Sequence, residues 1–205
     1  VTLATQPKFS IVVPVFEPNA GYLSACISSV VCQSYPTWEL LVVDASPHDG
    51  IAARCLEPMC DERIVHLRLE RNLGIAGNTN VGIENATGGW VAFLDYDDIL
   101  EPDALFCYVR AIARDADAAA LFCDEDTFEV DGQYRFPVFK SELNLDLLYS
   151  YNCVTHFLAV KREALEAIGT SPDDVTGAQD YDLTLRVIGG QDRPRPRRAL
   201  SLAPA

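Results

Sequence analysis

Three carboxylates follow a short apolar run near the middle of the chain. Residues 90–94 read Trp-Val-Ala-Phe-Leu, and Asp95, Asp97 and Asp98 come directly after them. Two like charges about 5 Å apart repel by roughly 3 kcal/mol at an effective dielectric constant of about 20. A proton, a neighbouring cation or a metal ion has to offset that repulsion. Because carboxylate oxygens suit hard divalent cations, the cluster predicts a Mg²⁺ or Mn²⁺ site with positions left for substrate phosphates. The alternative is a solvated turn before a helix.

Other polar groups follow further apolar segments. Asp44 ends the segment 39–44, Arg71 follows the segment 64–69, and Phe16 lies just past the segment 9–15. If these segments are parallel strands, their carboxyl ends share one edge of the sheet. Asp44 could then accept a hydrogen bond from a base N–H, and Arg71 could bind a phosphate or a carbonyl oxygen. Phe16 could stack on a flat ring. Taken singly, each residue also fits an ordinary surface or core position.

Two more candidates lie towards the end of the chain. Asp180 is near the start of a helix expected over residues 179–188, where free N–H groups favour an anion for structural reasons alone. Its functional interpretation is a general base that takes a proton from an acceptor hydroxyl. His156 lies on a strand expected over residues 153–160, and a lone histidine is more often structural than catalytic.

The elements that would position these residues alternate along the chain. Short apolar runs predict strands over 9–15, 39–44, 64–69, 90–94 and 118–123. Helical spacing between them predicts helices over 22–32, 51–57, 75–85 and 102–114. Residues 128–136 predict a hairpin with Asp131-Gly132 at its turn. This alternation predicts the α/β class, with a single Rossmann-like, mainly parallel sheet flanked by helices.

Length, hydrophobic content, net charge and cysteine number narrow the class of protein. With 205 residues, about half of them hydrophobic, the chain suits one globular domain. A net charge of -14 argues against nucleic acid as a partner, but a nucleotide ligand remains compatible. Seven cysteines without a C-x-x-C pair favour reduced thiols in a cytoplasmic protein. No apolar run approaches the roughly 20 residues of a membrane span, and we expect no transmembrane segment and no signal peptide.

Taken in order, these motifs resemble the family-two glycosyltransferases of GT-A fold over residues 9 to 190. The resemblance rests on Ile11-Val-Val-Pro-Val-Phe, Val-Val-Asp44, Arg71-Asn-Leu-Gly and Phe93-Leu-Asp-Tyr-Asp-Asp. The later motifs resemble bacterial polysaccharide and O-antigen enzymes, including rhamnosyltransferase-like members. They are Cys123-Asp-Glu-Asp, Phe139-Lys, Asn144-Leu-Asp-Leu-Leu, Tyr151-Asn, His156 and Gln179-Asp-Tyr-Asp-Leu.

The resemblance implies an inverting, metal-dependent hexosyl or rhamnosyl transferase. Asp95-Tyr-Asp97 matches the family's D-x-D motif, so Asp95 would face the donor ribose and Asp97 would hold Mg²⁺ or Mn²⁺ on the diphosphate. Asp44 would read the donor base, and Asp180 would deprotonate the acceptor hydroxyl. The donor would be a UDP- or dTDP-sugar, and the acceptor a saccharide or a lipid-linked saccharide.

The resemblance also implies the surroundings of the donor. Pro14, Val15 and Phe16 would form the slot for the base, and Arg71 would hold the base side of the nucleotide. A second group would line the acceptor or donor-sugar side, namely Asp124, Asp126 and His156. The location implied is cytoplasmic, with peripheral attachment to the inner membrane as a further option.

The sequence departs from the family pattern in several places. Ala45 replaces a second acidic residue, Thr79 replaces a frequent arginine, and the acidic pair reads Gln179-Asp180. We expect a leader over 1–8, the GT-A domain over 9–190, and a basic Pro/Arg tail over 191–205 that is disordered or a truncated lid. A non-catalytic GT-A nucleotide-binding module is therefore the alternative. A nucleotidyltransferase ranks lower, because no Gly-rich phosphate loop follows the first strand.

Overall fold

The computed structural model of the chain describes residues 6–47, 50–129, 132–169, 179–189 and 199–202. Its main sheet has the strand order β3-β2-β1-β4-β8-β5-β9. The bounds, in chain order, are β1 (Phe9–Val15), β2 (Trp38–Asp44), β3 (Ile64–Arg68), β4 (Trp90–Phe93), β5 (Ala120–Cys123), β8 (Ala159–Lys161) and β9 (Ala199–Leu202). The pairs β1–β2, β1–β4, β2–β3 and β5–β9 are parallel, whereas β8 runs antiparallel between β4 and β5. The predicted mainly parallel sheet is confirmed.

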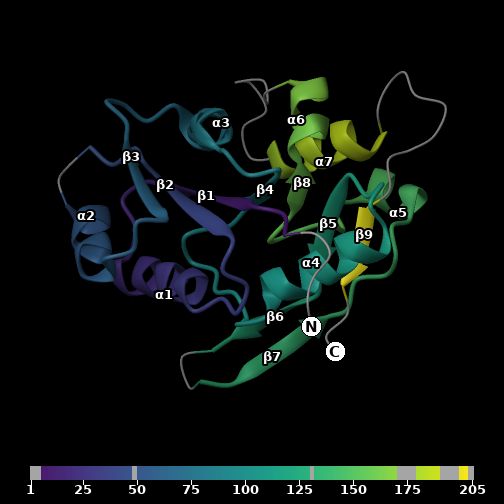
Figure 1. The fold of residues 1–205 in the computed structure, drawn as a ribbon, viewed down its shortest axis with the longest axis horizontal. Coiled ribbons are helices and arrows are strands. Elements are labelled where there is room, and N and C mark those ends of the chain that lie inside the picture. Colours follow the sequence, from purple (N-terminus) through teal and green to yellow (C-terminus); the bar gives the residue numbers. More distant parts are fainter. Residues whose placement is uncertain (1–5, 48–49, 130–131, 170–178, 190–198, 203–205) are drawn as a thin grey trace.

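Helices cover both faces of this sheet (Figure 1). One side carries α1 (Ala20–Val31), α2 (Ile51–Leu56), the short 3-10 helix η1 (Glu57–Met59) and α4 (Ala104–Arg114). The other side carries α3 (Gly74–Asn85), α5 (Leu145–Ser150), α6 (Arg162–Ile168) and α7 (Gln179–Gly189). Asn19 starts α1, because its side-chain oxygen accepts from the backbone N–H of Gly21 at 2.8 Å.

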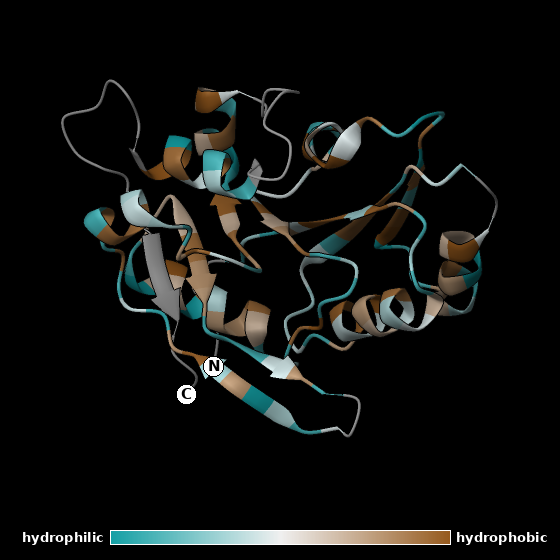
Figure 2. Cartoon of the chain, turned by 180° about the vertical axis from the view of Figure 1, so that it is seen from behind, coloured by the Kyte–Doolittle hydropathy of each residue, from teal (hydrophilic) through white to brown (hydrophobic). Residues whose placement is uncertain are grey.

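Alternate residues of the central strands pack into two apolar cores, one on each face of the sheet. Ile11 and Val13 face α1 and α4, whereas Val12 and Val43 face α3. All seven residues of β2 are buried, as expected for a strand covered on both faces. Figure 2 shows the central strands mostly in brown and the connecting loops mostly in teal. The sheet is therefore a rigid base for the loops at its edge.

A separate two-stranded ribbon projects from the body of the molecule (Figure 1). It pairs β6 (Glu125–Phe128) with β7 (Tyr134–Val138) in antiparallel fashion, which confirms the predicted hairpin. Its turn includes residues outside the described part of the chain. Every residue of β7 is exposed.

The end of the chain differs from the sequence prediction in two places. The strand expected over 153–160 is shorter and later, since β8 begins at Ala159, so His156 lies in a loop. Of the tail expected over 191–205, the structure describes Ala199–Leu202, which form strand β9 beside β5. Residues 199–202 form a strand because they pair with β5, and their local sequence pattern does not predict one.

The last residues of the expected leader are bound to the sheet. Lys8 Nζ lies 2.7 Å from Glu39 Oε2, and the Pro7 carbonyl accepts from the Tyr35 hydroxyl at 2.8 Å. Glu39 also accepts from the Ser10 hydroxyl at 2.5 Å and from the Thr87 N–H at 2.6 Å. The Glu39 carboxylate thus joins β1, β2 and the loop before β4.

Candidate functional site

The loop after β4 places three carboxylates at the edge of the sheet. The Leu94 N–H donates to the Val12 carbonyl at 3.1 Å, so β1 supports the chain up to this point. The Asp98 N–H then donates to the Asp95 carbonyl at 3.1 Å and closes a tight turn. Asp95 and Asp97 are exposed, and Asp98 is half-buried. The turn gathers the three side chains in a small volume.

His156 joins this cluster from a distant part of the chain. Its Nδ1 lies 2.8 Å from Asp98 Oδ2. The hydrogen bond to Asp98 raises the pKa of His156 to about 9, against the opposing effect of burial. His156 is therefore protonated near neutral pH. It supplies one of the cations that the closely spaced carboxylates require.

Asp180, at the start of α7, lies close enough to influence the same cluster. Loss of surrounding water, together with the charges of Asp98 and Asp180, raises the pKa of Asp95 to about 6. Loss of water also raises the pKa of Asp180, and the charge of His156 opposes this shift. Asp180 therefore lies near the cluster of Asp95, Asp98 and His156, since its charge and theirs influence one another. A carboxylate with a raised pKa is a better proton acceptor near neutral pH.

Asp44 lies at the same edge of the sheet, at the carboxyl end of β2. Its side chain is buried, with 1% of the residue exposed. Arg68 Nη1 lies 2.7 Å from Asp44 Oδ2, His66 Nε2 lies 3.3 Å from the same oxygen, and the Ser46 N–H donates to Oδ1 at 3.0 Å. Burial alone would raise the pKa of Asp44, but the bonds from Ser46, Arg68 and His66 outweigh it and lower the pKa.

The loop after β1 lies beside Asp44. Val15 stands opposite Asp44 in the parallel register, and its carbonyl accepts from the Ala45 N–H at 2.9 Å. Pro14 and Val15 are largely buried, whereas Phe16 is 43% exposed and lies outside the apolar core. The expected base slot thus combines a fixed backbone with one accessible ring.

Arg71 lies on the loop after β3, with its side chain exposed. Buried Asn78 of α3 holds this loop: its Oδ1 accepts from the Leu73 N–H at 3.1 Å, and its Nδ2 donates to Asn72 Oδ1 at 2.9 Å. The loop is therefore fixed against α3. The basic side chains that contact Asp44 among the described residues are Arg68 and His66.

The other predicted residues lie on or next to the ribbon. Asp124 Oδ1 accepts from the Lys140 N–H at 2.7 Å, so this carboxylate joins the two sides of the ribbon's base. Asp126, on β6, is exposed. Neither belongs to the carboxylate cluster defined by Asp95, Asp98 and His156.

The partner of Asp98 and the place of Arg68 in the site were not identified from the sequence. Asp98 was read as part of the acidic run with no partner of its own, and the structure pairs it with His156. Arg68 was not singled out, although it shares one face of β3 with His66, two residues earlier. That basic pair at strand spacing was the available signal.

A divalent cation is compatible with the donor set. Ligand atoms of Asp95, Asp98 and His156 all lie within 4.8 Å of one another. Two carboxylates suit Mg²⁺ or Mn²⁺. His156 could ligate the ion only in its neutral form, because a protonated imidazole has no free lone pair. Among the described residues Asp97 lies outside this group of three, although its exposed carboxylate is on the same turn.

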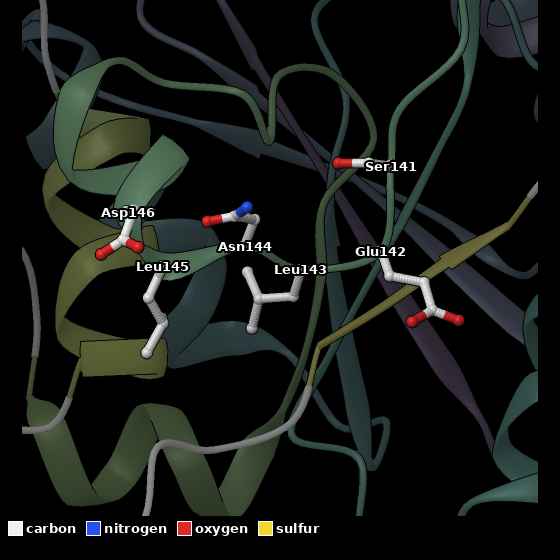
Figure 3. Close-up of a pocket in the computed structure, with 6 residues that line it drawn as sticks. All are labelled: Ser141, Glu142, Leu143, Asn144, Leu145 and Asp146. Atoms are coloured by element: carbon white, nitrogen blue, oxygen red, sulfur yellow. The ribbon is translucent and has the colours of Figure 1, made fainter.

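A shallow pocket lies in a different part of the molecule. Its lining comes from the one segment that leads into α5, residues Ser141, Glu142, Leu143, Asn144, Leu145 and Asp146 (Figure 3). Asn144 caps α5, because its Oδ1 accepts from the Leu147 N–H at 3.1 Å. The pocket shares no residue with the carboxylate cluster.

Comparison with known proteins defines the family. The family model for glycosyl transferase family 2 matches residues 10–169, and the chain belongs to this family. Over 187 residues, or 90% of this chain, the sequence is 35% identical to a protein of Myxococcus xanthus named O-antigen biosynthesis protein RfbC. The match covers 15% of that protein.

Solved structures show the same GT-A fold. TarS of S. aureus in complex with UDP-GlcNAc superposes with a TM-score of 0.73 at 20% identity, over 97% of this chain and 59% of that one. Mannosyltransferase PcManGT of Pyrobaculum calidifontis, in complex with GDP-Man and Mn²⁺, superposes with a TM-score of 0.71 at 22% identity, over 98% of this chain and 56% of that one.

The chain is short beside its relatives. It spans 15% to 27% of the length of three curated relatives that each match about nine tenths of it. Within the part of the chain that the structure describes, no helix has both the length and the apolar character needed to cross a bilayer. All seven cysteines are free thiols.

Proposed function

We propose that this domain transfers a sugar from a nucleoside-diphosphate donor to a hydroxyl group of a saccharide or lipid-linked saccharide, with inversion at the anomeric carbon. The observation that carries the proposal is that Asp180 lies near enough to Asp95 and His156 for their charges to act on one another, while His156 itself is bonded to Asp98. The groups come from α7, from the loop after β4 and from the loop before β8. Their convergence gives one site both a proton acceptor and carboxylates suited to a cation.

Asp180 acts as the general base in this proposal. The oxygen of the acceptor hydroxyl attacks the anomeric carbon as its proton passes to the Asp180 carboxylate. The bond from that carbon to the diphosphate oxygen breaks, and the nucleoside diphosphate leaves. A single displacement of this kind inverts the configuration. The raised pKa of Asp180 brings its basicity nearer to what proton transfer from a hydroxyl needs.

The donor nucleotide occupies the edge of the sheet between β1 and β3. Asp44 reads the base, the Pro14–Val15 backbone and Phe16 form its slot, and Arg71 holds its outer side. Support comes from the shared edge of the sheet and from the register that sets Val15 beside Asp44. A UDP- or dTDP-sugar is the proposed donor, and TarS, which has the same fold, has been solved in complex with UDP-GlcNAc.

Asp97, together with the neighbouring carboxylates, would hold Mg²⁺ or Mn²⁺ at this site. The cation would offset the negative charge that grows on the leaving diphosphate. The other roles at the site are assigned to side chains of this domain. Asp95 faces the ribose, and His156 with Asp98 limits the repulsion among the carboxylates. Asp124 and Asp126 are proposed to line the acceptor side.

The wider role proposed is synthesis of a bacterial surface polysaccharide in the cytoplasm, at or near the inner membrane. It rests on the relative named for O-antigen biosynthesis. Because the chain spans only a small part of that protein, the role of the whole protein is part of the proposal.

The test compares sugar transfer and donor hydrolysis in the wild type and in Asp180→Asn, with Mn²⁺ and a panel of UDP- and dTDP-sugars. We expect Asp180→Asn to lower turnover by about 10²-fold or more, the usual effect of removing a general base. Asp182→Asn is the matched control on the same helix, since Asp182 pairs with Arg186 at 2.8 Å. We expect that variant to stay within about threefold of the wild type.

Equal turnover in the wild type and Asp180→Asn would contradict the role of Asp180. Metal-dependent binding of nucleotide without turnover in either protein would favour the alternative, a non-catalytic GT-A module.

A further inference from the structure

The loop that carries His156 has an unusual backbone. His156 and Phe157 have φ angles of 52° and 40°, in the left-handed region that residues with a side chain rarely adopt. Such a conformation is unfavourable for a residue with a side chain, so contacts around it must hold the loop in place. The loop presents His156 to Asp98, at 2.8 Å.

One set of contacts fixes the residue before His156. The Lys140 ammonium donates to the Thr155 carbonyl and lies 2.6 Å from Glu125 Oε2. The Thr155 hydroxyl lies 3.2 Å from each oxygen of the same Glu125 carboxylate. Lys140, Glu125 and Thr155 therefore form a closed network between the ribbon and the loop.

A second contact fixes the residue after His156. The Tyr108 hydroxyl donates to the Phe157 carbonyl, and the two rings stack with centroids 5.2 Å apart. Both residues are buried. Because the carbonyls on either side of His156 are thus held from α4 and from the ribbon, the direction of its side chain is set by groups outside the loop.

The burial of Lys140 shows that this network is built into the fold. Its side chain is 4% exposed, although lysine is almost never buried unless its charge is paired. Burying an ammonium group is costly unless hydrogen bonds and an opposite charge compensate it. A salt bridge that served only to anchor the ribbon could lie at the surface. Here the ammonium bonds the backbone next to His156.

We propose that Lys140, together with Glu125, is a positioning residue that holds the Thr155 carbonyl and thereby keeps His156 on Asp98 in the carboxylate cluster. The consequence for transfer rests on the proposed function. Without Lys140 the Thr155–His156 peptide loses its donor, the loop relaxes from its left-handed conformation, and His156 leaves Asp98. Neither Lys140 nor Thr155 belongs to the proposed slot for the base, so nucleotide binding should change little.

A spectroscopic test does not depend on activity. In ¹⁵N-labelled protein, the ring N–H of His156 that faces Asp98 should give a protected imidazole signal, identified by its loss in His156→Asn. We expect Lys140→Met to abolish this signal through exchange with water, with the signals of the other two histidines as internal references. Lys161→Met is the matched control, since Lys161 pairs with Glu163 only at 3.8 Å on the surface, and should leave the signal intact.

Kinetics supply the second readout. We expect Lys140→Met to lower kcat about tenfold or more, with the KM for the nucleotide sugar within about twofold, as for groups that orient a functional side chain. In a His156→Asn background the same substitution should have no further effect on kcat, because residues that act through one another are not additive. Additive losses in that cycle would overturn the proposal.

Other outcomes are also decisive. A folded Lys140→Met protein with the His156 signal unchanged would overturn the proposal. If Lys140→Met does not fold, Glu125→Gln keeps the shape of the partner and removes its charge; the His156 signal must then weaken, and an unchanged signal again overturns the proposal. If the wild type transfers no sugar, the proposed function fails, while the signal still decides the positioning.

Discussion

Arg68 and Asp44 stand opposite each other in neighbouring parallel strands, with Nη1 2.7 Å from Oδ2. The side chain of Arg68 is 38% exposed and that of Asp44 only 2%. Since Ser46 also donates to Asp44, the carboxylate is fixed in direction before any ligand arrives. Because Arg68 and His66 cover Oδ2, a base N–H can reach this fixed acceptor only when one of these two side chains moves aside.

Asp44→Ala should therefore weaken the preference among nucleoside diphosphates. Loss of a site's hydrogen-bonding group removes the penalty for a mismatched base, so we expect the ratio of dissociation constants between the best and worst base to fall about tenfold. Calorimetric titration with a panel of nucleoside diphosphates measures this ratio. Glu62→Ala removes an exposed carboxylate before β3, at the opposite end of that strand from Arg68, and should leave the ratio unchanged. An unaltered preference in Asp44→Ala would remove Asp44 from the base slot.

Asp97→Ala should abolish the stabilisation that Mn²⁺ and a nucleoside diphosphate give together. A ligand at about 100 times its dissociation constant stabilises by about 2.7 kcal/mol, which corresponds to a rise in Tm of about 5–10 °C for a domain of this size. We expect that rise in the wild type and in the exposed-site control Asp117→Ala, and its absence in Asp97→Ala. A thermal-shift assay with and without Mn²⁺ measures it, and an undiminished rise in Asp97→Ala would exclude Asp97 as a ligand.

The sequence predicted the parts of the fold that depend on local pattern. Buried runs such as 39–44 are long enough to identify strands, and alternation with helices implies their parallel order. The position of Asp95 at a strand end follows from the same pattern. The antiparallel β8 could not be predicted, because an antiparallel strand of three residues between β4 and β5 is selected by its neighbours.

The partners of the candidate residues were harder to predict. The approach of His156 to Asp98 spans 58 positions and requires two left-handed residues without glycine, a conformation that the local sequence does not favour. The burial of Lys140 was equally hard to predict, because it depends on Glu125 and on the Thr155 carbonyl from another loop. Such contacts are products of the completed fold.

Glu39 should make stability depend on pH in the acidic range. Burial would raise its pKa, but bonds from Lys8, Ser10 and Thr87 outweigh burial and lower the pKa to about 2. A folded pKa below the unfolded value means that the contribution is complete above about pH 5 and is lost as the pH falls towards 2. Between about pH 6 and pH 3 the wild type should lose about 2 kcal/mol more of its free energy of unfolding than Glu39→Gln. Urea unfolding at a series of pH values measures the difference; parallel curves for the two proteins would contradict it.

Gly88 and Gly89 offer a matched pair of adjacent substitutions. A Cβ atom on Gly88 would lie 2.5 Å from the Lys8 carbonyl oxygen and 2.8 Å from the Ser10 nitrogen, whereas a Cβ on Gly89 would meet nothing within 4 Å. The Gly88 N–H also donates to the Ser10 hydroxyl at 2.7 Å, so the backbone cannot move away without losing that bond.

Gly88→Ala should therefore lower the free energy of unfolding by about 1–3 kcal/mol, the usual cost of overpacking. Gly89→Ala should leave it unchanged or raise it by less than about 1 kcal/mol, because alanine restricts the unfolded chain. Urea unfolding followed by tryptophan fluorescence compares the two, and equal stabilities would show that the approach of β1 to this loop is looser than these distances imply.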